Sequence, residues 1–503
     1  MGFARVYSAQ PVYLDTSIIH VEADLSKGLH SFSIVGLPDK AIEESRERVS
    51  AALKNSDFSS PKHSSKRVLI SLAPANIRKE GARFDLSIAV AYLLASSEVA
   101  FDAEGIVFLG ELSLQGHLRG TKGVLSIAQY LQKIGFHTLV VSSENAEEAA
   151  LVEGLTVLPA RTLREVVEHF DEKKDFVIKP QEKTDVSHTY ADELIDFGDI
   201  RGQETAKRGL EIAAAGRHNV VLYGPPGTGK TMLARALRSI LPPLTLDELL
   251  EATSIHSLAG TLHETVLTAP PFRSPHHTSS HIAIVGGGTI PRPGEVTLAH
   301  RGVLFLDEFP EFERRVVDAL REPLEDKVVT VSRAKGTAQF PANFVLVAAL
   351  NPTRERGEVQ INDLDRERLK KKISGPVIDR IDMWIEVTHI DHEKLHTKEE
   401  RVLISPTIRE IIRATRGVQE KRFSDSTKTN SDMSVTDIDE HAHLTKESEV
   451  MLMSAAKNLS LSPRSYHRTI KLARTIADLD KSETIEGGHI LEALTYRPKD
   501  LFE

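Results

Sequence analysis

The sequence predicts an α/β protein of several domains that ends in a helical lobe, and three observations predict this class. The chain has 503 residues, which is more than a single hydrophobic core usually organises. Strand-like alternation and helical spacing share residues 1–170, and short apolar strands alternate with helices over residues 191–390. Beyond residue 391, helical spacing replaces the strands.

The N-terminal part, residues 1–170, is expected to be an α/β domain. Apolar alternation predicts strands at "FSIVGL", "KRVLISLAP" and "HTLVVSS", and helical spacing covers Asp39 to Asn55 and Phe84 to Ala95. Residues 171–190, "DEKKDFVIKPQEKTDVSHTY", are polar and without a period, which is typical of a linker.

Residues 191–390 predict a second α/β domain. Its strands, at 220–223, 303–306 and 344–349, are wholly apolar, which indicates a parallel sheet covered by helices on both faces. Residues 391–503 predict a helical lobe or lid. Within it the polar stretch from Ser424 to Asp437 is expected to be a mobile loop.

Composition excludes several classes of protein. The net charge of −9 argues against indiscriminate nucleic-acid binding, although a local basic channel remains open. The chain has no cysteine, which excludes disulfides, thiolate zinc sites and cysteine nucleophiles. No apolar run approaches the ~20 residues that span a bilayer, and the first residues lack the apolar core of a signal peptide. We therefore expect a cytoplasmic protein.

A candidate phosphate-binding loop follows the apolar strand "VVLY". It matches G-x-x-x-x-G-K-[ST] and consists of Gly224, Pro225, Pro226, Gly227, Thr228, Gly229, Lys230 and Thr231. The glycines let backbone N–H groups turn towards phosphates, and the helix that follows adds its positive end. Lys230 would reach the β- and γ-phosphates, and Thr231 would ligate Mg²⁺. The sequence therefore predicts a nucleotide site.

Two further strands end in polar residues. "GVLFLDEF" ends in Asp307, which could hold Mg²⁺ through water, and Glu308, which could activate the attacking water. "FVLVAALNP" ends in Asn351, whose side chain could orient that water; the alternative is a simple Asn-Pro turn. The paired acids make the nucleotide site a candidate hydrolysis site.

Arg380 in "SGPVIDRIDMWIEV" and Arg464 in "LSPRSYHR" could each face a γ-phosphate, either from a neighbouring subunit or from the lid. From the residues alone, either could equally be a surface ion-pair residue.

Two segments are candidate projections from the second domain. Residues 256–301 contain six histidines (His256, His263, His276, His277, His281 and His300) without a recognised metal-ligand spacing, and Gly286 to Gly288 suggest a projecting flexible loop. "DKVVTVSRAKGTAQFP" predicts a β-hairpin with Arg333 and Lys335 at its tip, where they could contact a DNA backbone.

Taken together, these motifs resemble those of an AAA+ ATPase. The insert and the hairpin resemble the helix-2-insert and pre-sensor-1-hairpin branch, which includes magnesium chelatase subunits and the MCM helicases. "PFRSPHH", "GGGTIPRPGEVTLAHRGVLFLDEFPEF", "REPLED", "VSRAKGT", "PANFVLVAALNP" and "ARTIADL" are similar to the YifB/ComM family of magnesium-chelatase-like ATPases. "FSIVGLPDKAIEESRERVSAAL" and "LAPANIRKEGARFDL" extend the likeness into the N-terminal domain.

The resemblance implies an ATP hydrolase that uses ATP and Mg²⁺ and forms a homo-hexameric ring with nucleotides at subunit interfaces. It implies that Arg380 acts in trans as an arginine finger and that Arg464 is the second sensor. Family members tied to natural transformation are DNA helicases that promote branch migration, so single-stranded or branched DNA is the expected partner. The alternative is a chelatase-like ATPase that remodels a partner protein, whereas magnesium chelatase activity itself is not expected.

The N-terminal domain resembles the proteolytic domain of Lon proteases, a ribosomal protein S5 domain 2-like fold. The position that matches the Lon catalytic lysine is Leu125, and "KEGARFDLSIA" lacks a serine at the nucleophile's position, although Ser87 is nearby. The resemblance therefore implies a non-proteolytic version. Many relatives also carry a cysteine cluster after the Asn-Pro; residues 353–372 lack it, so we expect no zinc.

Overall fold

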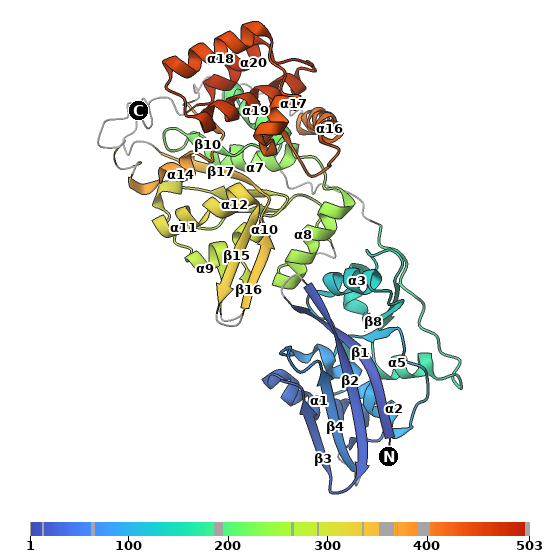
Figure 1. Ribbon diagram of the computed structural model, residues 1–503. Coiled ribbons are helices and arrows are strands. Elements are labelled where there is room, and N and C mark those ends of the chain that lie inside the picture. The colour runs from blue at the N-terminus through green and yellow to red at the C-terminus, as the bar shows by residue number, and fades with distance from the viewer. Residues whose placement is uncertain are drawn as a thin grey trace. The chain divides into compact units, whose positions relative to one another are not determined.

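The computed structural model describes residues 2–12, 15–61, 66–185, 195–262, 266–288, 291–333, 336–351, 367, 369, 371–389 and 403–497. The chain forms two compact units (Figure 1). Unit 1 comprises Met1–Ser187 and Leu246–Leu267, and unit 2 comprises His188–Thr245 and Thr268–Glu503. Residues 246–267 thus pack with the N-terminal unit although they follow the phosphate-binding loop in sequence. No helix in the described ranges is both long enough and apolar enough to cross a membrane.

Unit 1 is built on a seven-stranded mixed sheet with the order β3-β4-β2-β1-β5-β8-β9. Its strands are β1 (Gly2–Val12), β2 (Asp15–Lys27), β3 (Ser31–Val35), β4 (Lys66–Ala73), β5 (Ile106–Phe108), β8 (Thr138–Ser142) and β9 (Thr156–Ala160), and a separate pair is formed by β6 (Glu111–Leu112) and β7 (Leu118–Arg119). Alternate residues of β4, namely Val68, Ile70 and Leu72, are fully buried. This alternation places one face of the sheet in the core.

The helices of unit 1 pack on this sheet and on one another. They are α1 (Lys40–Asn55), η2 (Ala82–Phe84), α2 (Asp85–Ser96), α3 (Val124–Lys133), η3 (Ser143–Asn145), α4 (Ala146–Ala149), α5 (Leu163–Phe170) and α8 (Leu246–Ala259). Helix α1 begins after Asp39, whose carboxylate accepts a hydrogen bond from the backbone N–H of Ile42 at 2.9 Å. The described part of the expected linker, 171–185, has neither helix nor strand, yet Ile178 is buried in the core of unit 1.

Unit 2 contains a five-stranded sheet in which every neighbouring pair is parallel. The strands are β10 (Val220–Tyr223), β11 (Phe272–Arg273), β14 (Val303–Leu306), β17 (Val345–Leu350) and β18 (Met383–Glu386), in the order β11-β14-β17-β10-β18. The first strand of this sheet in sequence, β10, therefore lies between the last two, β17 and β18. The predicted parallel sheet is confirmed.

The remaining elements of unit 2 flank this sheet and form the C-terminal helical region, drawn in red in Figure 1. They are η4 (Phe197–Asp199), α6 (Glu204–Gly216), α7 (Lys230–Ile240), α9 (His281–Val285), β12 (Gly286–Gly287), β13 (Arg292–Pro293), α10 (Glu295–Leu298), η5 (Phe309–Glu311), α11 (Arg314–Ala319), α12 (Arg321–Asp326), β15 (Val328–Arg333), β16 (Gly336–Pro341), α14 (Gly375–Ile378), α16 (Ser405–Phe423), η6 (Asn430–Asp432), α17 (Val435–His441), α18 (Lys446–Asn458), α19 (Pro463–Leu479) and α20 (Gly487–Thr495).

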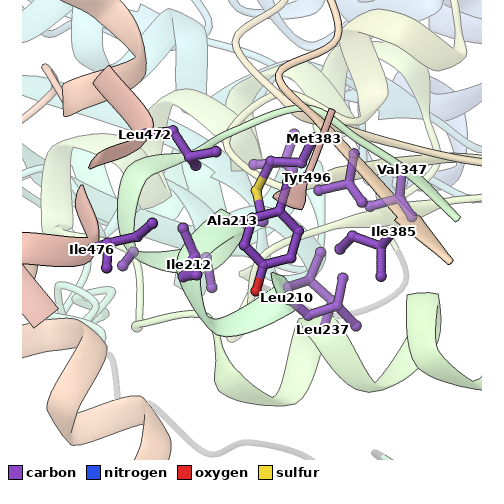
Figure 2. Packing of buried hydrophobic residues seen from close by; sticks show 14 of the residues in the cluster. Leu210, Ile212, Ala213, Leu237, Val347, Met383, Ile385, Leu472, Ile476 and Tyr496 are labelled. Carbon is purple, nitrogen blue, oxygen red and sulfur yellow. The ribbon is translucent and has the colours of Figure 1, made fainter. Parts of the chain in front are cut away.

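One continuous apolar cluster joins the parallel sheet to the helical region. Met383 and Ile385 of β18 meet α6, and Leu472 and Ile476 of α19 lie on the other side of the same helix (Figure 2). Tyr496, which is 3% exposed, lies among these side chains. The helical region is therefore fixed to the sheet by shared burial of apolar surface.

Two sequence expectations about loops are wrong. The stretch from Ser424 to Asp437 contains η6 and the start of α17, and Asn430 is fully buried with its side chain donating to Asp478 at 2.8 Å. Gly286 and Gly287 are buried in the β12–β13 pair rather than projecting. A Cβ on Gly286 would lie 2.5 Å from the carbonyl oxygen of Arg292, so the glycine there serves a close backbone approach.

Candidate nucleotide site

The candidate phosphate-binding loop connects β10 to α7 at the carboxyl edge of the parallel sheet. Gly224 has φ +157°, and a Cβ there would lie 2.1 Å from the carbonyl oxygen of Val387, so no larger residue fits. Gly227 and Gly229 have φ of +81° and +92°, which favour glycine. Because β10 lies between β17 and β18, the loop opens at the point where the strand order reverses, where ligands bind in open parallel sheets.

Lys230 lies inside this loop and is 7% exposed. Its Nζ donates to the carbonyl oxygens of Gly224 at 2.9 Å and Pro225 at 2.7 Å. Burial lowers the pKa of Lys230 to about 8, and the Asp307 carboxylate acts in the opposite direction. The ammonium is thus directed into the loop, where a phosphate would favour its charged form.

Asp307 follows the buried strand β14 and meets the loop directly. Its Oδ2 accepts from the hydroxyl of Thr231 at 2.9 Å, and its Oδ1 accepts from the backbone N–H of Glu308 at 2.9 Å. A hydroxyl and a carboxylate are oxygen ligands that Mg²⁺ prefers, so the pair fits this ion. Among the described residues no group of three or more His, Asp or Glu could hold a metal, so nucleotide phosphates and water would complete the coordination. His263 lies outside the described residues.

Glu308 has φ +51°, a left-handed backbone conformation that is uncommon outside glycine. Its Oε2 lies 3.1 Å from Nδ1 of His277, and His277 is packed against His276 with a ring separation of 4.2 Å. His277 belongs to the segment between β11 and α9. The carboxylate that the sequence predicts to activate water therefore has a partner, His277, which the sequence offered only as one of six histidines.

Asn351 follows β17, the strand that pairs with β10. Tyr223 is opposite Leu350 in this pair, and the backbone N–H of Gly224 donates to the carbonyl oxygen of Leu350 at 3.3 Å. Asn351 is exposed and lies beside the loop at the same edge of the sheet. The structure thus brings together the loop, Asp307, Glu308 and Asn351.

Arg380 and Arg464 lie elsewhere, at the amino edge of the sheet. Arg380 precedes β18, and its carbonyl oxygen accepts from the side chain of Asn219, the residue before β10, at 3.3 Å. The loop follows the other end of β10, roughly 13 Å away for a four-residue strand. Both arginines form ion pairs with Glu325 of α12. Neither arginine is therefore beside the loop of its own chain.

The predicted hairpin is present as β15 and β16, paired from Val328 with Pro341 to Arg333 with Gly336. Lys335 lies outside the described residues, and for Arg333 the structure describes the backbone alone.

In unit 1, Leu125 is fully buried, and the hydroxyl of the buried Ser87 donates to the carbonyl oxygen of Phe84 at 2.9 Å. Ser87 is thus engaged within its own helix.

The parallel sheet, the loop and the two acids that follow β14 define a P-loop nucleotide-binding protein of the AAA+ class. Three family models match: magnesium chelatase subunit ChlI over residues 196–395, subunit ChlI of Mg-chelatase over 21–145, and the ChlI C-terminal region over 404–497. The chain belongs to the YifB/ComM family of magnesium-chelatase-like ATPases.

Full-length relatives support this assignment. The chain is 40% identical to the competence protein ComM of Haemophilus influenzae over 508 residues, covering 99% of this chain and 98% of the relative. It is also 40% identical to the uncharacterized protein YifB of Escherichia coli, with the same coverage. The magnesium-chelatase 38 kDa subunit of Rhodobacter capsulatus is 31% identical over 201 residues, which cover 36% of this chain and 57% of the relative.

Sequence reasoning missed three groups at these sites. His277 was grouped with the candidate metal ligands, and nothing in the sequence spacing indicated that it contacts Glu308. Glu325 lies in "REPLED", one of the motifs that carried the family resemblance, and Arg468 lies four residues after Arg464 in "LSPRSYHR". A charged residue repeated at helical spacing within such a motif is the signal that could have found Arg468.

Proposed function

We propose that this protein is an ATP-driven motor that works as a ring of six identical subunits on single-stranded or branched DNA. In each chain Lys230 and the loop N–H groups would bind the phosphates, and Thr231 and Asp307 would hold Mg²⁺, which would offset charge on the phosphates. Glu308 would accept a proton from the attacking water, and Asn351 would orient that water.

One observation carries the shared-site part of this proposal. The loop and the two arginines lie at opposite edges of one parallel sheet, so one chain holds two incomplete halves of a hydrolysis site. A head-to-tail contact that repeats around a ring would bring the arginine half of one copy to the loop of the next. Arg380 and Arg464 would then stabilise charge on a neighbour's γ-phosphate.

The DNA part rests on the family. The full-length relative from Haemophilus influenzae is named a competence protein, and the family resemblance implies DNA helicases tied to natural transformation. We propose helicase activity that promotes branch migration in recombination, with the β15–β16 hairpin contacting the DNA backbone through Arg333 and Lys335. The N-terminal unit would be a non-proteolytic, Lon-like platform for DNA or for subunit contacts. The alternative, remodelling of a partner protein, follows from the likeness to the magnesium-chelatase subunit.

Two inactive variants test the shared site. Lys230→Ala removes the loop half and Arg380→Ala removes the arginine half, so each protein alone should hydrolyse ATP at a small fraction of the wild-type rate. Mixed in equal amounts, about one quarter of the contacts in a randomly mixed ring would pair an intact loop with an intact arginine. Recovery of hydrolysis in the mixture is expected. No recovery, with both proteins in mixed rings, would refute a site shared between copies.

DNA dependence is tested separately on the wild-type protein. Forked DNA should raise the rate of ATP hydrolysis, and replacing both Arg333 and Lys335 with Glu should weaken DNA binding and make the remaining binding less sensitive to salt, because fewer phosphates are neutralised. If the double variant bound DNA as well as the wild type, and DNA did not affect hydrolysis, the partner-protein alternative would replace the DNA motor.

A further inference from the structure

The two arginines line a cavity of about 510 Å³ in unit 2 that is rich in charge. Its cationic side chains are Lys327, Arg380, Arg464, Arg468 and Lys471. They come from α12 and its C-terminal end, from the turn before β18 and from α19. The P-loop residues are absent from its lining, so this is a second charged site, separate from the loop.

Most anions around this cavity already have structural partners. Asp382 accepts from the backbone N–H of Asn219 at 3.1 Å and lies 3.5 Å from His218, and Asp432 accepts from the backbone N–H of Thr429 at 3.0 Å. Glu325 differs, because its side chain is half exposed and contacts the arginines. One carboxylate oxygen pairs with Arg464 at 2.6 Å and the other pairs with Arg380.

The cations of the cavity are incompletely satisfied. Arg468 donates to the carbonyl oxygen of Ile381 at 2.7 Å, but its other terminal nitrogen is buried without a hydrogen-bond partner in the described structure, as is Nε of Arg380. Burial lowers the pKa of Arg380, and the neighbouring Arg464, Arg321 and Arg468 lower it further. Three guanidinium groups that repel one another are stabilised by an anion with more acceptor oxygens than one carboxylate offers.

We propose that Glu325 is a resident counter-ion that occupies a terminal-phosphate position between Arg380 and Arg464, and that an arriving phosphate displaces it and also engages Arg468. This inference rests on the proposed function, in which the phosphate is the γ-phosphate of ATP bound to the neighbouring copy. Each guanidinium contacts one oxygen of the Glu325 carboxylate, and two oxygens of a phosphate can accept the same two contacts while a third faces Arg468. The exchange involves no covalent step: one anion leaves the arginines and another replaces it.

The same contact explains why Arg380 and Arg464 would not bind a phosphate readily in an isolated chain. With Glu325 in place, each arginine has a partner and the local charge is partly neutralised. A phosphate must compete with this carboxylate before it gains the arginines. Glu325 is therefore a positioning residue, which sets when Arg380 and Arg464 become available.

The test measures phosphate binding rather than hydrolysis. The full-length chain carries Lys230→Ala to disable its own loop, and inorganic pyrophosphate is titrated into it by calorimetry at low salt. Adding Glu325→Gln should tighten pyrophosphate binding about tenfold, because the competing charge is gone while the side chain keeps its size. Adding Arg464→Gln or Arg468→Gln to that double variant should reverse the gain.

Asp326→Asn is the matched control, because it removes the same charge one residue along α12, and no ion pair joins Asp326 to these arginines in the described structure. Glu325→Asp keeps the charge on a shorter side chain, so its pyrophosphate affinity should lie between those of the protein with Glu325 and the Glu325→Gln variant. This variant replaces Glu325→Gln in the test if Glu325→Gln lowers the melting temperature. Unchanged pyrophosphate affinity in Glu325→Gln, or an equal gain in Asp326→Asn, would overturn the proposal.

A parallel titration with a short single-stranded oligonucleotide separates the two sources of phosphate. Terminal phosphates carry more charge and more free oxygens than backbone diesters, so oligonucleotide affinity should not change with Glu325→Gln. If the oligonucleotide gained affinity and pyrophosphate did not, the site would serve DNA and the exchange proposed here would be wrong. Wild-type ATP hydrolysis is measured independently: its absence, alongside tighter pyrophosphate binding, would refute the proposed function and leave the exchange standing.

Discussion

The carboxylate of Glu308 lies 3.1 Å from Nδ1 of His277, so the side chain placed to activate water is held by the segment between β11 and α9. That segment leads into the β12–β13 pair, whose Gly286 lies against Val331 of the hairpin, where an added Cβ would be 3.5 Å from the valine methyl. The hairpin is therefore connected to Glu308 through a short chain of contacts, along which a movement of the hairpin would be transmitted.

We predict that His277→Ala raises ATP hydrolysis in the absence of DNA, by up to about fivefold, because a partly exposed contact with a carboxylate contributes up to about 1 kcal/mol and its loss frees Glu308. Steady-state hydrolysis at saturating ATP measures this. The control is His276→Ala, which removes the ring that lies against His277, whereas no hydrogen bond or ion pair joins His276 to Glu308 in the described part of the chain. A fall in rate would show that His277 aligns Glu308 for catalysis instead of restraining it.

Glu308→Gln should lower the hydrolysis rate by about 10²–10⁴-fold, the usual contribution of a general base, while ATP affinity changes only a few-fold. The amide keeps the size of the side chain and cannot take up the proton of water. Single-turnover hydrolysis and analogue binding separate the two effects. Glu311→Gln is the control, because this nearby acid pairs with Lys372 at 2.7 Å; a similar loss there would point to a general charge effect.

The pKa of Lys230 predicts a proton linkage to nucleotide binding. Phosphate favours the charged ammonium, so binding should raise the pKa of Lys230 above about 8 and take up a proton. The affinity for nucleotide should be constant below pH about 8. Above this pH it should fall by up to about tenfold per pH unit, until Lys230 loses its proton in the nucleotide-bound protein as well. Calorimetry of an ATP analogue in buffers of different ionisation enthalpy measures the uptake. Lys230→Arg, which stays charged, should abolish it; wild-type binding at pH 8.5 without proton uptake would contradict this assignment.

The sequence predicted the hydrolysis half of the site because local pattern determines it. Apolar strands of four to six residues predict a parallel sheet. The carboxyl ends of such strands lie at one edge of the sheet, and this places Thr231 beside Asp307. The number of residues between Arg380 and Arg464 does not predict that their side chains lie close together. Their meeting on Glu325 depends on how α19 packs across the sheet, which is a tertiary property.

The same limit explains the errors. Polar composition suggested that residues 424–437 form a mobile loop, but Asn430 is buried because Gln419, Thr475 and Asp478 satisfy its polar groups. Glycine content suggested a projecting loop at 286–288, whereas the glycines permit close packing. Composition reports the average environment of such residues, and here specific hydrogen bonds and backbone contacts override it.

The grouping of α8 with unit 1 yields a last prediction about stability. Ser257 of α8 donates to the carboxylate of Glu148, which also accepts from the backbone N–H of Leu125 at 3.1 Å and from Asn145 at 3.2 Å. Burial raises the pKa of Glu148, and these donors act against that rise. Since the folded pKa lies above the ordinary value of 4.5, ionised Glu148 weakens the folded state as pH rises through that folded pKa.

Ser257→Ala removes a donor from the ionised form, so it should destabilise unit 1 by about 2 kcal/mol at pH 8 and by clearly less near pH 5, where more of Glu148 is protonated. Urea unfolding of the full chain at the two pH values measures the difference. Ser257→Ala/Glu148→Gln provides the control, because an amide has no charge to desolvate and the pH dependence of the serine effect should vanish. An equal cost of Ser257→Ala at both pH values would mean that α8 is held to unit 1 by its apolar contacts, and that Glu148 and Ser257 contribute no more than an ordinary neutral hydrogen bond.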